Sequence, residues 1–67
     1  MNQYSINGKT YTSEEIKKIG NNLASLWGGS CISFEVNEKE QEITFDCIEN
    51  GEEFVSTLKY DELDEYK

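Results

Sequence analysis

Two kinds of side chain in this sequence are suited to chemistry, carboxylates and thiols. The 67 residues include fourteen Asp and Glu and two cysteines, Cys31 and Cys47, but no histidine. A cysteine nucleophile needs a base beside it, and the chain has no histidine to act as that base. Paired carboxylates do acid–base work only inside a pocket, for which so short a chain has little volume. We therefore expect no catalytic residues and predict that the protein is not an enzyme.

The same residues offer little support for a metal or a cofactor. The spacing of the two cysteines matches no zinc pattern, and no histidine completes one. The acidic run Asp61-Glu62, Asp64-Glu65 lacks the spacing and the glycine of a calcium loop. The sequence therefore predicts neither a metal site nor a cofactor, and loose binding of a divalent cation by this run is the third of three functional hypotheses.

Charge is distributed unevenly along the chain, whose net charge is −8. Residues 1–34 hold two acidic residues and three lysines, for +1, whereas residues 35–67 hold twelve acidic residues and three lysines, for −9. A nucleic-acid-binding protein needs a basic face, and six lysines without arginine are too few to build one. The distribution excludes direct binding of nucleic acid and predicts a basic partner.

The compartment is predicted from what the sequence lacks. It has no run of eighteen apolar residues that would suit a membrane span, and its first residues, MNQYSINGK, lack the apolar segment of a signal peptide. Two cysteines are also too few for a disulfide-stapled scaffold of this size. These features predict a cytoplasmic protein with reduced thiols and no membrane association.

The N-terminal part predicts a hairpin followed by a helix. Asn7-Gly8 suits a type I′ turn, which would pair Tyr4 with Tyr11. Thr12-x-x-Glu15 has the form of a capping box and predicts a helix from Thr12 to Trp27, which Gly28-Gly29 would end. Trp27 is expected to cover the core as a lid. The apolar stripe of this helix comprises Ile16, Ile19, Leu23 and Leu26, with Gly20 on the stripe side where the helix would closely approach a sheet.

Residues 30–60 predict three antiparallel strands in a meander. Asn50-Gly51 is a second type I′ signal, and its two-residue loop would set Cys47 opposite Phe54. Alternation along the strands predicts the inward residues and the pairs Phe34 with Phe45 and Val36 with Ile43. By this parity Ile32 points inward, whereas Cys31 points outward and cannot form a redox pair with Cys47. Cys31 is therefore expected to react faster with thiol reagents.

These elements together predict the fold class. Residues 1–67 would form a single α+β domain of two layers with the order ββαβββ. One helix packs on an antiparallel three-stranded meander, and whether the N-terminal hairpin joins that sheet is left open. The acidic tail, residues 60–67, would form either one helical turn or a frayed end.

Carboxylates gather on the meander and its turns. Alternate residues of a strand lie about 6.6–6.8 Å apart and neighbouring strands about 4.8 Å apart, so acidic strands present charges at a spacing similar to that of phosphates. The Asn50-Gly51 turn also sets Glu49 opposite Glu52, an unfavourable pair for stability alone. Val55 and Ile48 would form a small apolar spot among these charges. The predicted partner-binding residues are Glu35, Glu42, Asp46, Glu49, Glu52, Glu53 and Val55.

Two functional hypotheses follow from this surface. In the first, the protein occludes a basic, nucleic-acid-binding surface of a partner protein. In size, acidity and one-sided charge the chain resembles small phage-type inhibitors such as DNA mimics, anti-restriction proteins and anti-CRISPR proteins. In the alternative, the protein is a structural or regulatory module that self-associates, as a homodimer for example, and its acidity serves only solubility.

Overall fold

The chain forms two antiparallel sheets and two helices, and the computed structural model describes residues 3–66. The order along the chain is ββαβββ followed by a short 3-10 helix, so the predicted α+β class is confirmed. The elements are β1 (Gln3–Ile6), β2 (Lys9–Thr12), α1 (Ser13–Ser25), β3 (Ser30–Asn37), β4 (Glu42–Glu49), β5 (Glu52–Lys59) and the 3-10 helix η1 (Tyr60–Tyr66).

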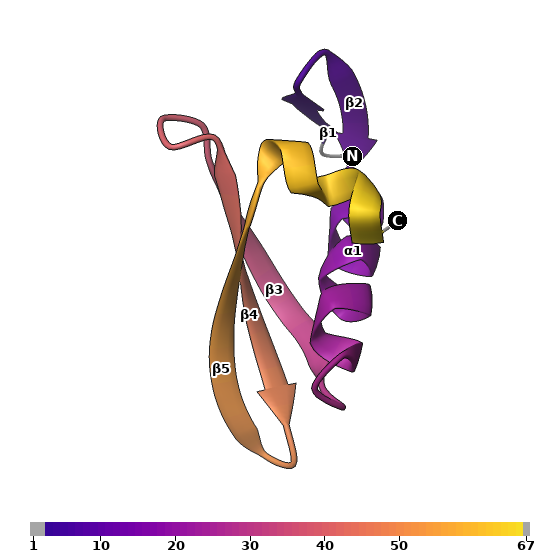
Figure 1. Ribbon diagram of the computed structural model, residues 1–67, viewed down its shortest axis with the longest axis vertical. Coiled ribbons are helices and arrows are strands. Elements are labelled where there is room, and N and C mark those ends of the chain that lie inside the picture. Colours follow the sequence, from indigo (N-terminus) through magenta and orange to yellow (C-terminus); the bar gives the residue numbers. More distant parts are fainter. Residues whose placement is uncertain (1–2, 67) are drawn as a thin grey trace.

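The N-terminal hairpin stands apart from the main sheet. Strands β1 and β2 pair only with each other, whereas β3, β4 and β5 form the second sheet with β4 in the centre. Figure 1 shows α1 against one side of this second sheet and the β1–β2 hairpin beyond the N-terminal end of α1. Both predicted hairpin turns have the positive φ angles of a type I′ turn, 52° and 77° at Asn7-Gly8 and 51° and 82° at Asn50-Gly51.

Helix α1 begins as its capping box predicts. The backbone N–H of Glu15 donates to the Thr12 hydroxyl at 3.1 Å, and the backbone N–H of Thr12 donates to the Glu15 carboxylate at 2.9 Å. The helix ends at Ser25, two residues before the predicted end at Trp27. The reason is a tightened last turn, in which the N–H of Trp27 donates to Ala24 and that of Gly28 to Ser25, three residues back.

The apolar stripe of α1 packs against the sheet. Ile16, Ile19 and Leu23 are buried as predicted, whereas Leu26 lies beyond the end of the helix and is 64% exposed. Gly20 lies at the closest approach, because a Cβ atom there would come within 2.5 Å of Cδ1 of Phe45. Only glycine brings the helix this close to the centre of β4.

The register of the meander is the predicted one. The turn at Asn50-Gly51 sets Cys47 opposite Phe54, and the side chains of Ile43, Phe45, Cys47 and Leu58 are buried on the helix side. Phe34 lies opposite Phe45 and is partly buried against the core rather than fully buried. Glu42 lies opposite Lys59, but these two side chains form no ion pair.

The start of β3 differs from the prediction because of a β-bulge. The register shifts between Cys31 and Ser33, so the alternation that places Phe34 inward does not extend back to Ile32. Ile32 is 42% exposed instead of buried, and Cys31 is 6% exposed and lies directly opposite Cys47. The side-chain oxygen of Asn21 on α1 accepts a hydrogen bond of 2.7 Å from the backbone N–H of Cys31 and so holds this end of β3 against the helix.

We expect both thiols to be unreactive in the native protein, which corrects the expectation that Cys31 reacts faster. Cys31 and Cys47 are free and buried, and burial raises the pKa of each thiol. A thiol-specific chromogenic reagent should modify each of them about a hundredfold or more slowly than in the denatured chain, because the core must open first. The variants Cys31→Ser and Cys47→Ser separate the two rates. Rapid modification of Cys31 in the folded protein would contradict the bulge.

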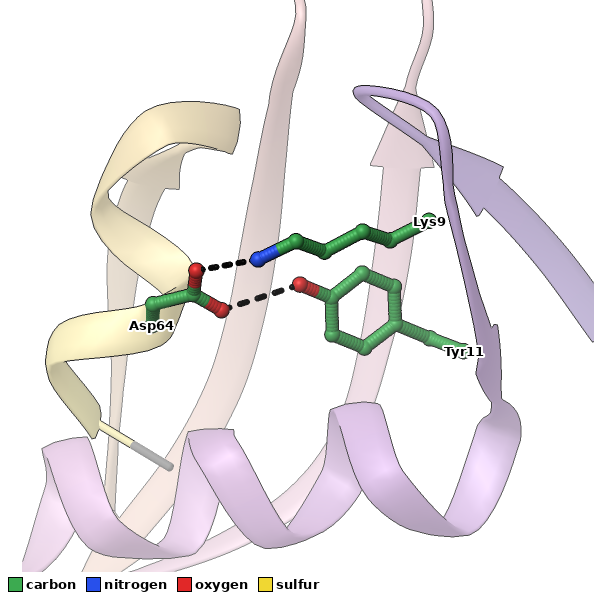
Figure 2. A network of polar contacts seen from close by, with 3 residues as sticks. All are labelled: Lys9, Tyr11 and Asp64. Atoms are coloured by element: carbon green, nitrogen blue, oxygen red, sulfur yellow. Dashed lines mark hydrogen bonds and ion pairs between the residues drawn. The ribbon is translucent and has the colours of Figure 1, made fainter.

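The acidic tail is ordered against the rest of the molecule. Tyr60–Tyr66 form η1, which contacts α1 and β5, and Leu63 is fully buried. Asp64 accepts from the Lys9 ammonium group at 2.6 Å and from the Tyr11 hydroxyl at 3.1 Å, which ties the tail to β2 (Figure 2). The Asn22 side chain donates to the carbonyl of Tyr66 at 2.6 Å. The tail therefore completes the core.

Candidate protein-interaction surface

The structure divides the seven predicted partner-binding residues between two places. Strand parity puts Glu35, Glu42, Asp46, Glu53 and Val55 on the side of the β3–β4–β5 sheet that faces away from α1, which we call the outer face. Glu49 and Glu52 have the opposite parity, because Glu49 lies two positions after the inward residue Cys47 and Glu52 lies two positions before the inward residue Phe54. The residues predicted as one site therefore form two groups.

The outer face carries carboxylates without lysine partners. Glu35 and Glu53 are exposed, whereas Glu42 and Asp46 are partly buried by their neighbours. Within residues 3–66, none of these carboxylates forms an ion pair. Among the residues of the three strands, Lys59 is the lysine that parity places on this face, and it forms no ion pair with the described carboxylates although it lies opposite Glu42. The outer face therefore presents a negative field to any molecule that approaches the sheet.

An apolar spot lies within this field. Val55 is 64% exposed opposite Asp46, and Ile48 is partly buried opposite Glu53, so the two residues lie diagonally across the hairpin as predicted. The bulge adds Ile32, which lies with Ser33 on the same exposed side of β3. Sequence parity missed Ile32 because a bulge of one residue cannot be read from alternation alone.

The second group, together with Glu53 at the edge of the outer face, lines a groove at the tip of the β4–β5 hairpin. This groove, which we call the hairpin-tip groove, has a volume of about 390 Å³. Figure 1 shows the β4–β5 turn at the end of the molecule where α1 terminates. One wall is aromatic, because the rings of Trp27 and Phe54 meet edge to face with their centroids 6.3 Å apart. The residues that line it are Trp27, Glu49, Asn50, Glu52, Glu53, Phe54 and Ser56.

Two glycines allow Trp27 to reach the hairpin. Gly28 has a φ angle of 78°, which turns the chain out of the helix, and a Cβ atom on Gly29 would lie 2.7 Å from the carbonyl oxygen of Ile48. Trp27 is consequently 53% exposed and lies beside Phe54, rather than covering the core as predicted. The sequence signal for this placement is the second of the two glycines directly after Trp27, because one glycine is enough to end a helix.

The hairpin-tip groove combines this aromatic wall with negative charge. Three of its lining residues are glutamates, and no lysine lines it. Glu49 and Glu52 are direct cross-strand partners, so their charges repel each other at the tip. A wall of aromatic rings beside unpaired carboxylates suits an organic cation.

Outside the hairpin-tip groove, the described residues form a further hollow lined by Tyr4, Glu35, Val36, Asn37 and Glu38. Within residues 3–66, no three acidic or cysteine side chains come together as metal ligands. In the tail, Glu62 accepts the backbone N–H of Lys59 and Asp64 binds Lys9, so these two carboxylates have structural contacts. No helix within these residues is long and apolar enough to cross a membrane.

Comparison of the chain with protein-family models, with curated proteins and with solved structures gave no match.

Proposed function

We propose that this protein binds a basic, nucleic-acid-binding surface of a partner protein and thereby blocks access of nucleic acid to it. The supporting observation is that, among residues 3–66, the carboxylates of β4 and β5 have no lysine partners on either side of the sheet. Stability alone favours opposite charges across a hairpin, yet this one places Glu49 against Glu52. A positive surface that docks here relieves this repulsion, which is a gain available only in the complex.

The proposed mechanism is electrostatic occlusion. Carboxylates on two antiparallel strands approximate the charge spacing of a nucleic-acid backbone, and the apolar spot at Val55 supplies a contact centre that excludes water. The negative half of the chain steers the encounter with a basic partner and speeds association. Such an inhibitor acts in the cytoplasm, of a bacterium or of the bacterial host if it is encoded by a phage.

Reversal of charge at the hairpin tip tests this proposal. Each exposed ion pair is worth about 0.2–1 kcal/mol, so single changes are expected to be mild. The triple variant Glu49→Lys, Glu52→Lys, Glu53→Lys turns attraction into repulsion and should weaken binding about tenfold or more. The partner is first isolated by affinity capture from the source cells at low and high salt. Displacement of a labelled oligonucleotide from the purified partner is then measured with wild type and variant.

A matched control variant carries the same change in net charge at the other end of the sheet. Glu38→Lys, Glu40→Lys, Asp61→Lys alters three exposed residues outside both the outer face and the hairpin-tip groove. It should displace the oligonucleotide nearly as well as wild type. Binding should weaken with salt for every variant, because charges at the surface are screened over about 8 Å at physiological ionic strength. Equal displacement by the hairpin-tip variant and wild type would refute occlusion through this hairpin.

Self-association remains the second candidate function, and the apolar spot is the observation that favours it. Ile32 and Val55 are 42% and 64% exposed on the outer face, where a second copy would cover them. Analytical ultracentrifugation over a salt series separates the two functions. A dimer that persists at high salt and dissociates in Val55→Ser would support self-association, whereas a monomer under all conditions would exclude it.

A further inference from the structure

We propose that the hairpin-tip groove is a binding site for one arginine side chain of the basic partner, held between the indole of Trp27 and the carboxylates of Glu49, Glu52 and Glu53. This inference rests on the proposed function and specifies the chemical group that the partner contributes. The observations that support it are the shape of the groove and the residues that line it, in addition to the overall negative charge of the surface.

The first observation is an aromatic side chain held open to solvent. Trp27 is 53% exposed although the chain has few apolar residues with which to form its core. Its position is imposed by the backbone, because Gly29 packs so closely on Ile48 that no other residue fits there. Phe54 supports one edge of the indole at a centroid distance of 6.3 Å. The ring is thus pre-positioned, and a ligand need not order it on binding.

The second observation is the charge around this ring. Glutamates 49, 52 and 53 line the same groove, and no lysine lines it. The negative face of an aromatic ring attracts cations, and adjacent carboxylates strengthen this preference. An anion or a neutral apolar group would leave these glutamates uncompensated, so the groove is selective for positive charge.

The third observation is size. The volume of about 390 Å³ lies near the lower end of the range of about 300–1,000 Å³ for small-molecule sites. The groove is therefore suited to a single side chain rather than to a folded element. A guanidinium is planar, stacks on aromatic faces and binds a carboxylate through two parallel hydrogen bonds, whereas an ammonium group is a point charge without this planar, two-donor geometry. These properties favour arginine over lysine.

Trp27 itself provides the readout, because it is the only tryptophan in the chain. The probe is a short blocked peptide with two arginines separated by glycines, and matched peptides carry lysine or glutamine instead. The arginine peptide should change the Trp27 emission saturably, with an affinity at least about threefold higher than that of the lysine peptide. The glutamine peptide should cause no change. Equal affinities for the arginine and lysine peptides would overturn the assignment to arginine.

Two variants test the two walls of the groove separately. Glu49→Gln, Glu52→Gln keeps the tryptophan and removes the repulsion at the tip, so it should fold and should bind the arginine peptide about five- to tenfold more weakly. The variant Trp27→Leu has no tryptophan emission, so its binding of the arginine peptide is measured by calorimetry and should be about threefold weaker or more. The matched control Glu38→Gln, Glu40→Gln removes the same charge from the distant β3–β4 turn and should bind as wild type does. Equal losses in both glutamine variants would show a general charge effect and overturn the site.

The two proposals fail in different ways. If Trp27→Leu occludes the partner as well as wild type while the triple lysine variant does not, the arginine site is wrong and occlusion stands. If the arginine peptide binds this groove but the protein never displaces nucleic acid from the captured partner, occlusion is wrong and the arginine site stands.

Discussion

Replacing Phe45 with alanine is expected to unfold this protein. Phe45 is fully buried at the centre of β4, where it lies opposite Phe34 and Ser56 and directly below Gly20 of α1. Truncation of a buried phenylalanine costs about 3–5 kcal/mol. The total stability of a chain of this length is about 3–10 kcal/mol. The loss is thus comparable to the entire stability, because Phe45 is the residue on which the helix and both flanking strands converge.

Thermal unfolding followed by circular dichroism measures this effect. The matched control is Val55→Ala on the neighbouring strand, which shortens a side chain that is 64% exposed on the outer face and should change the free energy of unfolding by about 0.5 kcal/mol or less. A Phe45→Ala protein with nearly native thermal stability would show that the register of β3, β4 and β5 is not the one described.

Replacing Leu63 with alanine is expected to release the tail and to cost about 2–5 kcal/mol. Leu63 is fully buried although it belongs to a single short 3-10 helix near the end of the chain. It belongs to the buried core, and η1 contacts both α1 and β5, so truncation of Leu63 is expected to leave a cavity where these elements meet. Chemical denaturation should give a correspondingly lower midpoint, and hydrogen exchange in residues 60–66 should rise to the rate of an unfolded segment.

Asp64→Asn is the control for this prediction, because it tests whether charge rather than burial holds the tail. The two side chains of the Lys9–Asp64 ion pair in Figure 2 are each about half exposed, so removal of this pair should cost much less stability than the loss of Leu63.

The hydrogen bond with Asp64 raises the pKa of Lys9, and burial raises the pKa of Tyr11. The contribution of each group to the free energy of unfolding is therefore fully present below its ordinary pKa, which is 10.5 for Lys9 and 10.0 for Tyr11, and is lost as the pH rises further. A larger loss of stability in Asp64→Asn than in Leu63→Ala would contradict this account.

The parts of the fold that the sequence predicted are those governed by local chemistry. The capping box at Thr12 and Glu15 links residues three positions apart, and the type I′ turns at Asn7-Gly8 and Asn50-Gly51 involve adjacent residues. A two-residue turn determines the register of its hairpin, so the pairing of β4 with β5 follows directly from the sequence. The stop of α1 was predicted two residues late because helix termini tighten according to the contacts around them.

The candidate site was predicted in its charge and missed in its geometry. The six acidic residues of the predicted site were chosen from composition, strand parity and turn position, but Glu49 and Glu52 were grouped with Glu35 although parity places them on the other side of the sheet. Trp27 was expected to cover the core as a lid, and the groove that it forms with Phe54 and the hairpin tip was not predicted, although Phe54 packs against the core as expected. Whether an aromatic ring lies in the core or beside it depends on how two elements meet, which no local pattern contains.

Local sequence patterns were sufficient to predict the class of the fold, the register of the β4–β5 hairpin and the concentration of negative charge in residues 35–67, because each follows from the identity or spacing of neighbouring residues. The tertiary structure alone decided the bulge at Cys31, the exposure of Ile32 and Trp27 and the docking of η1. These features depend on contacts between residues far apart in the chain, such as Asn21 with Cys31 and Lys9 with Asp64. These contacts stabilise the fold only when α1, the sheet and the tail pack together. They therefore produce no periodic pattern in the sequence from which they could be predicted.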